Sequence, residues 1–214
     1  PEVEMSRRLT QAGYANTPAL LGEVARRDAD GSTRTLALLH AYLVHEGDAW
    51  VWTIDYLKRA LEDALLRDAS VEEFNEGLAG YATVACTVGR RLAELHSVLA
   101  RPCDDPAFAP QVAQTEDAQA RADQIVAMLD RALHTLRGLR DTLEPGARAC
   151  AAWLDEHRDR LAGQIAVLAQ AETGAPHLRI HGDFHLGQVL LAQTDAYLID
   201  FEGEPGRPLS ARRA

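Results

Sequence analysis

The sequence predicts an α+β fold, in which a short strand-rich start leads into a mostly helical body and a late β-hairpin. Three observations carry this prediction. A hairpin pattern lies between residues 20 and 44, apolar residues recur at helical spacing in the middle, and two apolar runs flank a polar turn at residues 193–195. At 214 residues, with 47% hydrophobic residues, the chain fits one large domain or two small ones with a packed core.

The first elements are a helix and a hairpin. Residues 1–12 are predicted to be helical, because Pro1 suits the first helical position. Residues 20–27 and 33–44 read as strands, and the sequence Asp28-Ala29-Asp30-Gly31 between them is a typical hairpin turn.

Helices follow from residue 48 onward. Asp48 is a suitable N-cap for a helix from Ala49 to about Leu66. Residues 71–99 are predicted to form one long helix, although its glycines weaken it unless close packing uses them. Residues 101–110 hold three prolines and are predicted to be a linker loop.

A second helical region lies further along the chain. Apolar residues recur at helical spacing over 125–136 and again over 154–168. The sequence Glu144-Pro145-Gly146 separates the two stretches, so they are predicted to form an antiparallel helical pair.

Composition excludes several classes of protein. The formal net charge is −10, from 32 acidic and 22 basic residues, which argues against a nucleic-acid binder and suits an enzyme with a neutral or cationic substrate. Cys86, Cys103 and Cys150 are odd in number and form no C-x-x-C pair, so reduced thiols are expected. The chain opens on no signal peptide and contains no apolar run long enough to cross a membrane. We therefore expect a cytoplasmic protein.

The most informative stretch is a loop near the end of the chain. His181, Asp183 and Gln188 precede Asp200-Phe201-Glu202 in the order and spacing of the kinase catalytic loop H-x-D-x-x-x-x-N and its following D-F-G. Phosphoryl transfer needs a carboxylate near the acceptor hydroxyl and two oxygen ligands for the metal on the nucleotide phosphates. The sequence therefore predicts a kinase active site.

A hairpin places the metal ligands of this site together. The runs 189–191 and 197–199 flank the turn Gln193-Thr194-Asp195 and are predicted to pair. Gln188 would then lie where the first strand begins and Asp200 where the second ends. Because magnesium prefers hard oxygen ligands and keeps much of its water and phosphate shell, one carboxylate and one amide oxygen suffice.

Another interpretation of the same residues is a hydrolase metal cluster. His181, Asp183 and His185 alternate, and alternating residues on a strand share a face. A dinuclear phosphoesterase would need several further Asp, His and Asn ligands at strand ends, and the sequence offers no second cluster. The joint spacing favours the kinase interpretation.

With these residues in view, the chain resembles the aminoglycoside-phosphotransferase-like branch of the kinase fold, where H-G-D replaces H-R-D. Within that branch it closely resembles bacterial maltokinases. Gln188, where the wider superfamily usually has Asn, and the run Glu202-Gly203-Glu204-Pro205 favour maltokinase over its relatives. The motifs that carry the resemblance are Asn16-Thr17-Pro18, Leu20-Leu21-Gly22, Gly47-Asp48-Ala49-Trp50, Leu95-His96, His181 to Gln188, and Asp200 to Pro205 running into Arg207-Pro208-Leu209.

The resemblance implies an ATP- and Mg²⁺-dependent kinase that phosphorylates maltose at its anomeric hydroxyl, giving maltose 1-phosphate for glycogen synthesis from trehalose. Asp183 would orient and deprotonate that hydroxyl, and His181 would brace the loop. Gln188 and Asp200 would hold magnesium. Glu2 best matches the helix glutamate that pairs with the phosphate-gripping lysine.

Other residues keep alternative roles open. Glu4 is the alternative to Glu2. His185 is assigned either to substrate contact or to structure, and Glu202 and Glu204 either to sugar hydroxyls or to an exposed acidic turn.

Two tryptophans and one histidine lie outside the loop. Trp50 and Trp52 are expected to pack rather than to stack on a sugar. His96 is expected to be a packed core histidine.

The resemblance also implies an internal fragment. The family's first strands, its phosphate-gripping lysine and its last helices have no counterpart here, and no G-x-x-x-x-G-K-[ST] motif occurs. Residues 1–46 would then be a remnant of the nucleotide-binding N-lobe, and residues 47–214 a truncated helical C-lobe. Such a fragment is expected to be inactive by itself, with the glutamate of its first helix unpaired and solvated.

Three functional hypotheses remain. The first is the maltose kinase, and the second is a kinase of the same fold for another acceptor, such as an aminoglycoside. The third is a non-catalytic module attached to a trehalose synthase, which is a possible fusion partner or complex partner that the resemblance implies. Nucleic acid and membrane are not expected as partners. Retention of Asp183, Gln188 and Asp200 together argues against lost catalysis.

Overall fold

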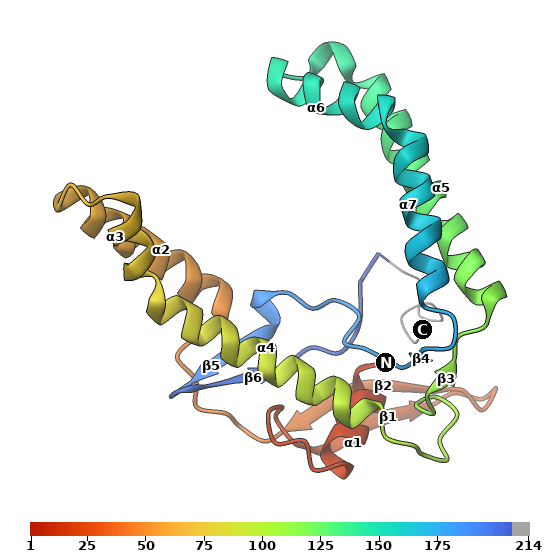
Figure 1. The fold of residues 1–214 in the computed structure, drawn as a ribbon. Coiled ribbons are helices and arrows are strands. Elements are labelled where there is room, and N and C mark those ends of the chain that lie inside the picture. Colours follow the sequence, from red (N-terminus) through yellow and green to blue (C-terminus); the bar gives the residue numbers. More distant parts are fainter. Residues whose placement is uncertain (207–214) are drawn as a thin grey trace. The chain divides into compact units, whose positions relative to one another are not determined.

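The computed structural model describes residues 1–206, and the chain divides into two compact units, drawn in Figure 1. Among the described residues, unit 1 comprises residues 1–110 and 178–206, whereas unit 2 comprises Gln111–His177. Both helices and strands are present, in agreement with the predicted α+β class. Arg207-Pro208-Leu209, which the resemblance includes, lies outside the described residues.

The elements of unit 1 surround one hydrophobic core. They are α1 (Glu2–Gln11), β1 (Leu20–Arg27), β2 (Thr33–His40), α2 (Ala49–Leu66), α3 (Val71–Gly77), α4 (Ala79–Leu99), η2 (Leu186–Gln188), β5 (Val189–Ala192) and β6 (Asp195–Leu198). Helix α1 buries Met5 and Leu9 almost completely, at 1% and 0% exposure. They pack with side chains of α4, β5 and β6, including Leu95, Val189 and Leu198. The predicted first helix is confirmed, and it packs against the hairpin that follows the predicted catalytic loop.

Strands β1 and β2 form the predicted antiparallel hairpin, with Arg27 opposite Thr33 at its turn. The prediction that the second strand reaches Val44 is wrong, since β2 ends at His40. The last backbone bond of the ladder runs from Ala41 N to Ala19 O (2.8 Å). The residue before Ala19 is Pro18, which has no N–H to continue the ladder.

Helix α2 begins and ends where the sequence predicts, because the Asp48 side chain accepts a hydrogen bond from Val51 N (2.9 Å) as an N-cap. The prediction of a single helix over residues 71–99 is wrong, since Leu78 interrupts it between α3 and α4. Tyr56 Oη donates to Gly77 O (3.0 Å) at this break. A Cβ atom at position 80 would lie 3.0 Å from the same hydroxyl, so Gly80 allows this close contact between α2 and α4.

The β5–β6 hairpin packs on α4 through a polar network at its turn. Asp195 accepts from Arg91 Nε (2.7 Å) and Nη2 (2.9 Å), and Asn16 Nδ2 donates to the same carboxylate (3.1 Å). These bonds hold the pKa of Asp195 below its ordinary value, although its partial burial acts in the opposite direction. The network fixes the hairpin that positions Gln188 and Asp200.

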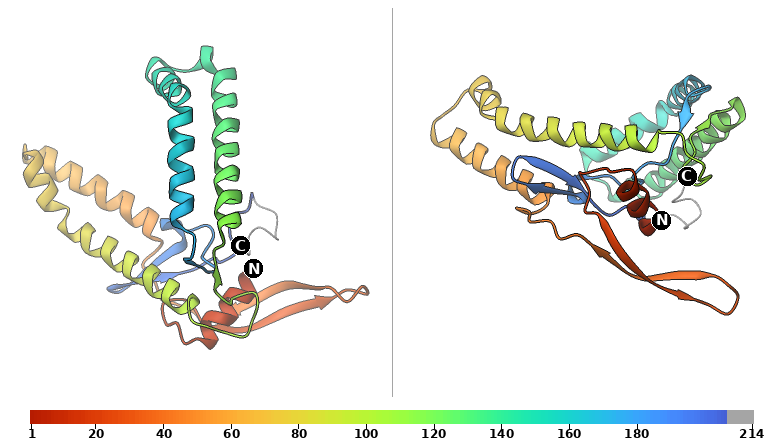
Figure 2. Two further views of the ribbon diagram at one scale, coloured as in Figure 1. Left: turned by 45° about the vertical axis from the view of Figure 1, so that its right-hand side comes forward. Right: turned by 90° about the horizontal axis from the view of Figure 1, so that it is seen from below.

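Unit 2 contains β3 (Gln111–Val112), α5 (Thr115–Gly138), η1 (Arg140–Thr142), α6 (Pro145–Glu156), α7 (Arg158–Ala171) and β4 (Pro176–His177). Figures 1 and 2 show α5 and α7 side by side and antiparallel, which confirms the predicted pair. The second member is not one helix, because it breaks at His157. There the imidazole stacks on Trp153 (4.1 Å) and its Nδ1 lies 2.8 Å from Trp153 O.

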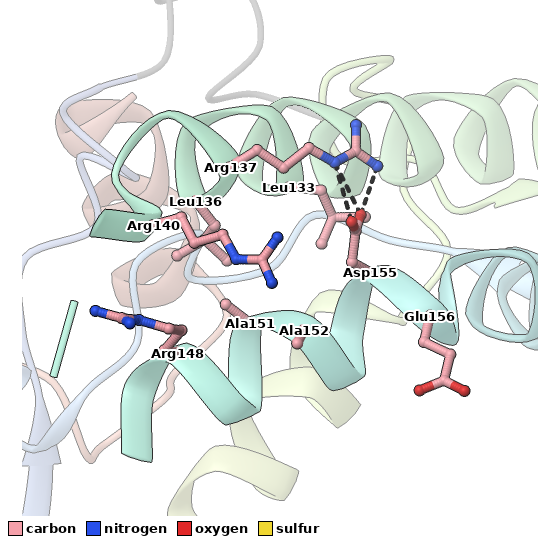
Figure 3. Close-up of a pocket in the computed structure, with 9 residues that line it drawn as sticks. All are labelled: Leu133, Leu136, Arg137, Arg140, Arg148, Ala151, Ala152, Asp155 and Glu156. Carbon is pink, nitrogen blue, oxygen red and sulfur yellow. Dashed lines mark hydrogen bonds and ion pairs between the residues drawn. The ribbon is translucent and has the colours of Figure 1, made fainter. Parts of the chain in front are cut away.

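A shallow pocket of about 290 Å³ lies at one end of unit 2, between α5 and α6. Figure 3 shows Arg137 paired with Asp155 there, with Arg140 and Arg148 nearby. None of the predicted site residues lines this pocket, because all of them belong to unit 1. No helix among residues 1–206 is both long and apolar enough to span a membrane.

Candidate active site

The H-G-D loop and the D-F-E-G segment touch through two glycines. Gly182 has φ +86° and Gly203 has φ +74°, which is a backbone region that side chains rarely adopt. A Cβ atom at position 182 would lie 3.2 Å from Gly203 Cα. Any residue other than glycine at position 182 would therefore be strained and would push the two segments apart.

The metal-ligand pair of the sequence prediction is adjacent in the structure. Gln188 Nε2 donates to Asp200 Oδ2 at 2.8 Å, and Ile199 N donates to Gln188 O at 3.0 Å between their strands. Asp200 has φ +63°, which is an uncommon backbone conformation for a residue other than glycine. One carboxylate beside one amide is a donor set that fits a hard cation with a large water and phosphate shell. Their metal role remains a prediction.

Asp183 is partly exposed on the same loop, five residues before Gln188. The described part of the chain supplies no hydrogen-bond partner for its carboxylate. A carboxylate that is both accessible and unpaired can accept a proton from a bound hydroxyl group.

His181 lies beneath the loop rather than in solvent, with 3% exposure. Its Nε2 donates to Ile199 O (2.9 Å), and its ring packs on Phe184 (5.5 Å) and Phe201 (4.9 Å). Burial lowers the pKa of His181, although the bond to Ile199 and nearby carboxylates act in the opposite direction. A neutral, enclosed imidazole supports the bracing role and not proton transfer.

Glu2 and Glu4 are both engaged, so the expectation of an unpaired, solvated glutamate is wrong. Glu2 accepts hydrogen bonds from Phe201 N and from Ser6 Oγ (3.1 Å). Burial raises the pKa of Glu2, and the negative charge of Asp200 raises it further, although its two hydrogen bonds act in the opposite direction. Glu4 forms an ion pair with Arg179 (3.1 Å). Helix α1 therefore holds both segments of the site.

Arg179 is a structural residue that the sequence analysis missed. Its side chain is 3% exposed, its Nη2 donates to Pro1 O (3.3 Å), and its guanidinium lies 4.7 Å from the centroid of the Phe108 ring. Its position two residues before His181, with Ile180 between them, is the alternation that places both side chains on one face. This alternation with His181 is the sequence pattern that could have identified Arg179 as an inward-facing residue.

The sugar-contact candidates do not meet in one pocket. His185 is exposed and lines a pocket of about 450 Å³ with Asp48, Trp50, Val51 and Gly187. Glu202 instead lines a separate pocket of about 850 Å³, together with residues of α1, β1 and β2 that include Glu2. Glu204 is exposed.

Trp50 and Trp52 differ in how far they are buried. Trp52 stacks on Tyr56 (5.1 Å) and packs against the core, as predicted. The packing prediction is wrong for Trp50, which is 56% exposed. His96 is only partly buried.

A polynuclear hydrolase site receives no support. Residues 1–206 contain no group of three or more His, Cys, Asp or Glu side chains that could hold a metal ion. Of the three alternating residues, His181 faces inward to a carbonyl and His185 faces the exposed pocket.

Comparisons with known proteins agree on one group of enzymes. No model of a protein family matches the chain. Among curated proteins, a glucosamine kinase of Streptacidiphilus jiangxiensis is 29% identical over all of this chain and 42% of its own length. A second glucosamine kinase, from Mycolicibacterium smegmatis, is 27% identical over 94% of this chain and 43% of its own length.

Solved structures give the same result. A glucosamine kinase in complex with glucosamine, ADP and inorganic phosphate matches all of this chain and 44% of its own, with a TM-score of 0.70 and 24% identity. A second crystal form of a glucosamine kinase matches equally well, with a TM-score of 0.70 over 99% of this chain. The chain shares the fold of these sugar kinases and spans less than half the length of the relatives it matches.

Proposed function

We propose that the protein containing this chain is an ATP-dependent sugar kinase. The observation that carries the proposal is the arrangement of Asp183, an accessible carboxylate, on the same loop as the adjacent pair Gln188 and Asp200. Phosphoryl transfer rests on positioning and charge stabilisation, and this arrangement supplies an acceptor-side carboxylate and a cation site. The relatives of the same fold are sugar kinases, and one was solved with glucosamine, ADP and phosphate.

Each residue has one task in this proposal. Asp183 orients the acceptor hydroxyl and takes its proton. Gln188 and Asp200 hold magnesium, which neutralises charge on the nucleotide phosphates when bound. His181 fixes the loop through Ile199, and Glu2 fixes the backbone after Asp200 through Phe201 N.

Glucosamine is the first acceptor that we propose. The matched relatives carry that name, and the ammonium group of glucosamine suits a chain with a formal net charge of −10. The exposed Glu202 and Glu204 beside the metal aspartate add local negative charge.

Maltose is the second acceptor, favoured by Gln188 and by the Glu-Gly-Glu-Pro run. Under that alternative the product is maltose 1-phosphate, formed at the anomeric hydroxyl, and a trehalose synthase is the expected fusion or complex partner.

The test is an acceptor panel with the whole protein that carries this sequence. Purified enzyme is incubated with ATP and magnesium and with glucosamine, maltose or an aminoglycoside, and ADP release and phosphosugar are both measured. We expect sugar-dependent ADP release with glucosamine as the best acceptor. Asp183→Asn should lower kcat by at least ~100-fold, since an amide cannot accept the proton. Sugar-independent ATP hydrolysis alone, or near-normal kcat in that variant, would refute the proposal.

A further inference from the structure

An exposed tryptophan stands beside the catalytic loop. Trp50 lies in the first turn of α2 with 56% of its surface accessible, and its neighbour Val51 is 54% accessible. By contrast, Trp52 is covered by Tyr56 and Tyr81 (ring centroids 5.1 and 6.3 Å). What distinguishes Trp50 is that it and Val51 line a pocket together with His185, where an aromatic ring offers a flat apolar face to a ligand.

The backbone under Trp50 is fixed to the hairpin of the site. Asp48 caps α2 and forms a β-bridge with Leu190. Leu191 N donates to Gly47 O (3.0 Å), and Glu46 N donates to Leu191 O (2.8 Å). Ala49, just before Trp50, is 1% exposed. The indole is therefore presented from a rigid base, which lowers the entropic cost of binding.

His185, two residues after Asp183, also lines this pocket. Its Nδ1 accepts a hydrogen bond from Gly187 N (3.1 Å), so the neutral ring carries its proton on Nε2. A Cβ atom at position 187 would lie 2.8 Å from His185 Cε1, so the glycine is needed for this ring position. The ring thus offers one fixed N–H donor from the catalytic loop itself.

We infer that this pocket binds the ring of the acceptor sugar. The inference rests on the proposed kinase function and adds the residues that select the acceptor. The apolar C–H face of a pyranose ring lies on Trp50, and His185 Nε2–H donates to a ring hydroxyl, two residues from the carboxylate that takes the acceptor proton. A cavity of about 450 Å³ is within the usual range of small-molecule sites, ~300–1,000 Å³.

The experiment uses Trp50→Ala in the whole protein. We expect the KM for the sugar to rise about tenfold, with kcat and the KM for ATP within about twofold of wild type, because a binding contact is lost and the chemistry is kept. Trp50→Phe should recover part of the affinity. The matched control is Trp153→Ala, which removes a tryptophan of similar exposure (51%) in unit 2 and should change none of these constants.

Other outcomes would overturn the inference. An unchanged sugar KM in Trp50→Ala would remove the stacking role, and a raised ATP KM with normal sugar KM would assign the pocket to the nucleotide. Fluorescence separates this test from the kinase assay. Glucosamine should quench wild-type tryptophan emission and leave Trp50→Phe unaffected, even if turnover were absent. Equal quenching in both proteins would refute the inference regardless of activity.

Discussion

Arg179 gives the most direct test of how α1 is joined to the H-G-D loop. Arg179→Ala removes a side chain that is 3% exposed, an ion pair with Glu4 at 3.1 Å, a bond to Pro1 O at 3.3 Å and a cation 4.7 Å from the Phe108 ring. Breaking a buried ion pair costs about 3–5 kcal/mol. The Glu4 side chain is 28% exposed and can rehydrate, so the lower part of that range applies. A cation–π contact adds about 0.5–1 kcal/mol.

We therefore expect unit 1 to lose about 3–4 kcal/mol of unfolding free energy in Arg179→Ala. The assay is urea unfolding of the 214-residue chain followed by tryptophan emission in a Trp153→Phe background, where the remaining Trp50 and Trp52 both lie in unit 1. Arg179→Lys should recover only part of the loss, because an ammonium lacks the planar fork.

The matched control is Arg7→Ala, which breaks the exposed α1 pair with Glu23 (46% and 32% exposed side chains). It should cost at most about 1 kcal/mol. If Arg179→Ala cost no more than Arg7→Ala, the buried pair would not be what fastens α1 to the loop.

Two further predictions concern the metal pair and the buried histidine. Asp200→Ala should abolish the magnesium-dependent part of ATP binding, measured by calorimetry. Gln188→Asn should weaken this binding less, since the amide oxygen is kept on a shorter side chain. Equal nucleotide affinity with and without magnesium in the wild-type protein would contradict both expectations. Because burial lowers the pKa of His181, the unfolded state binds the extra proton first, and stability should fall as the pH drops below about 6.5. His181→Gln should flatten that part of the pH profile of the urea midpoint, and an unchanged slope would exclude His181 as its source.

The sequence predicted the turns and helix ends that are determined by residues close to them in the chain. The turn at Asp28–Gly31 and the cap at Asp48 lie within a few residues of the elements they set, and both boundaries were correct. At the helix break, Tyr56 of α2 donates a hydrogen bond to Gly77 O, and a contact between residues 21 positions apart leaves no mark in the local pattern. Pro18 indicates where β2 ends, but only when the register of the two strands is known, since the register shows which residue of β2 would pair with Pro18.

The same division holds for the site. The spacing of Gln188 and Asp200 was enough to place them at the two ends of one hairpin, because two paired strands bring residues twelve apart into contact. The burial of Glu2 against Phe201 N arises from packing between residues about two hundred positions apart. The choice of acceptor depends on side chains around the loop, so the motif itself does not predict which acceptor is bound.

The small β3–β4 pair has a consequence for how the polypeptide is threaded. Gln111 lies opposite His177 and Val112 opposite Pro176, so the chain enters and leaves unit 2 through two adjacent strands. Paired residues of antiparallel strands lie only about 5 Å apart. The two ends of unit 2 are therefore as close together as the two ends of a tight turn, and unit 2 can be regarded as a long insertion between Pro110 and Leu178. Its helices can lengthen, shorten or change sequence over evolutionary time without moving the ends that lead to Arg179 and the H-G-D loop.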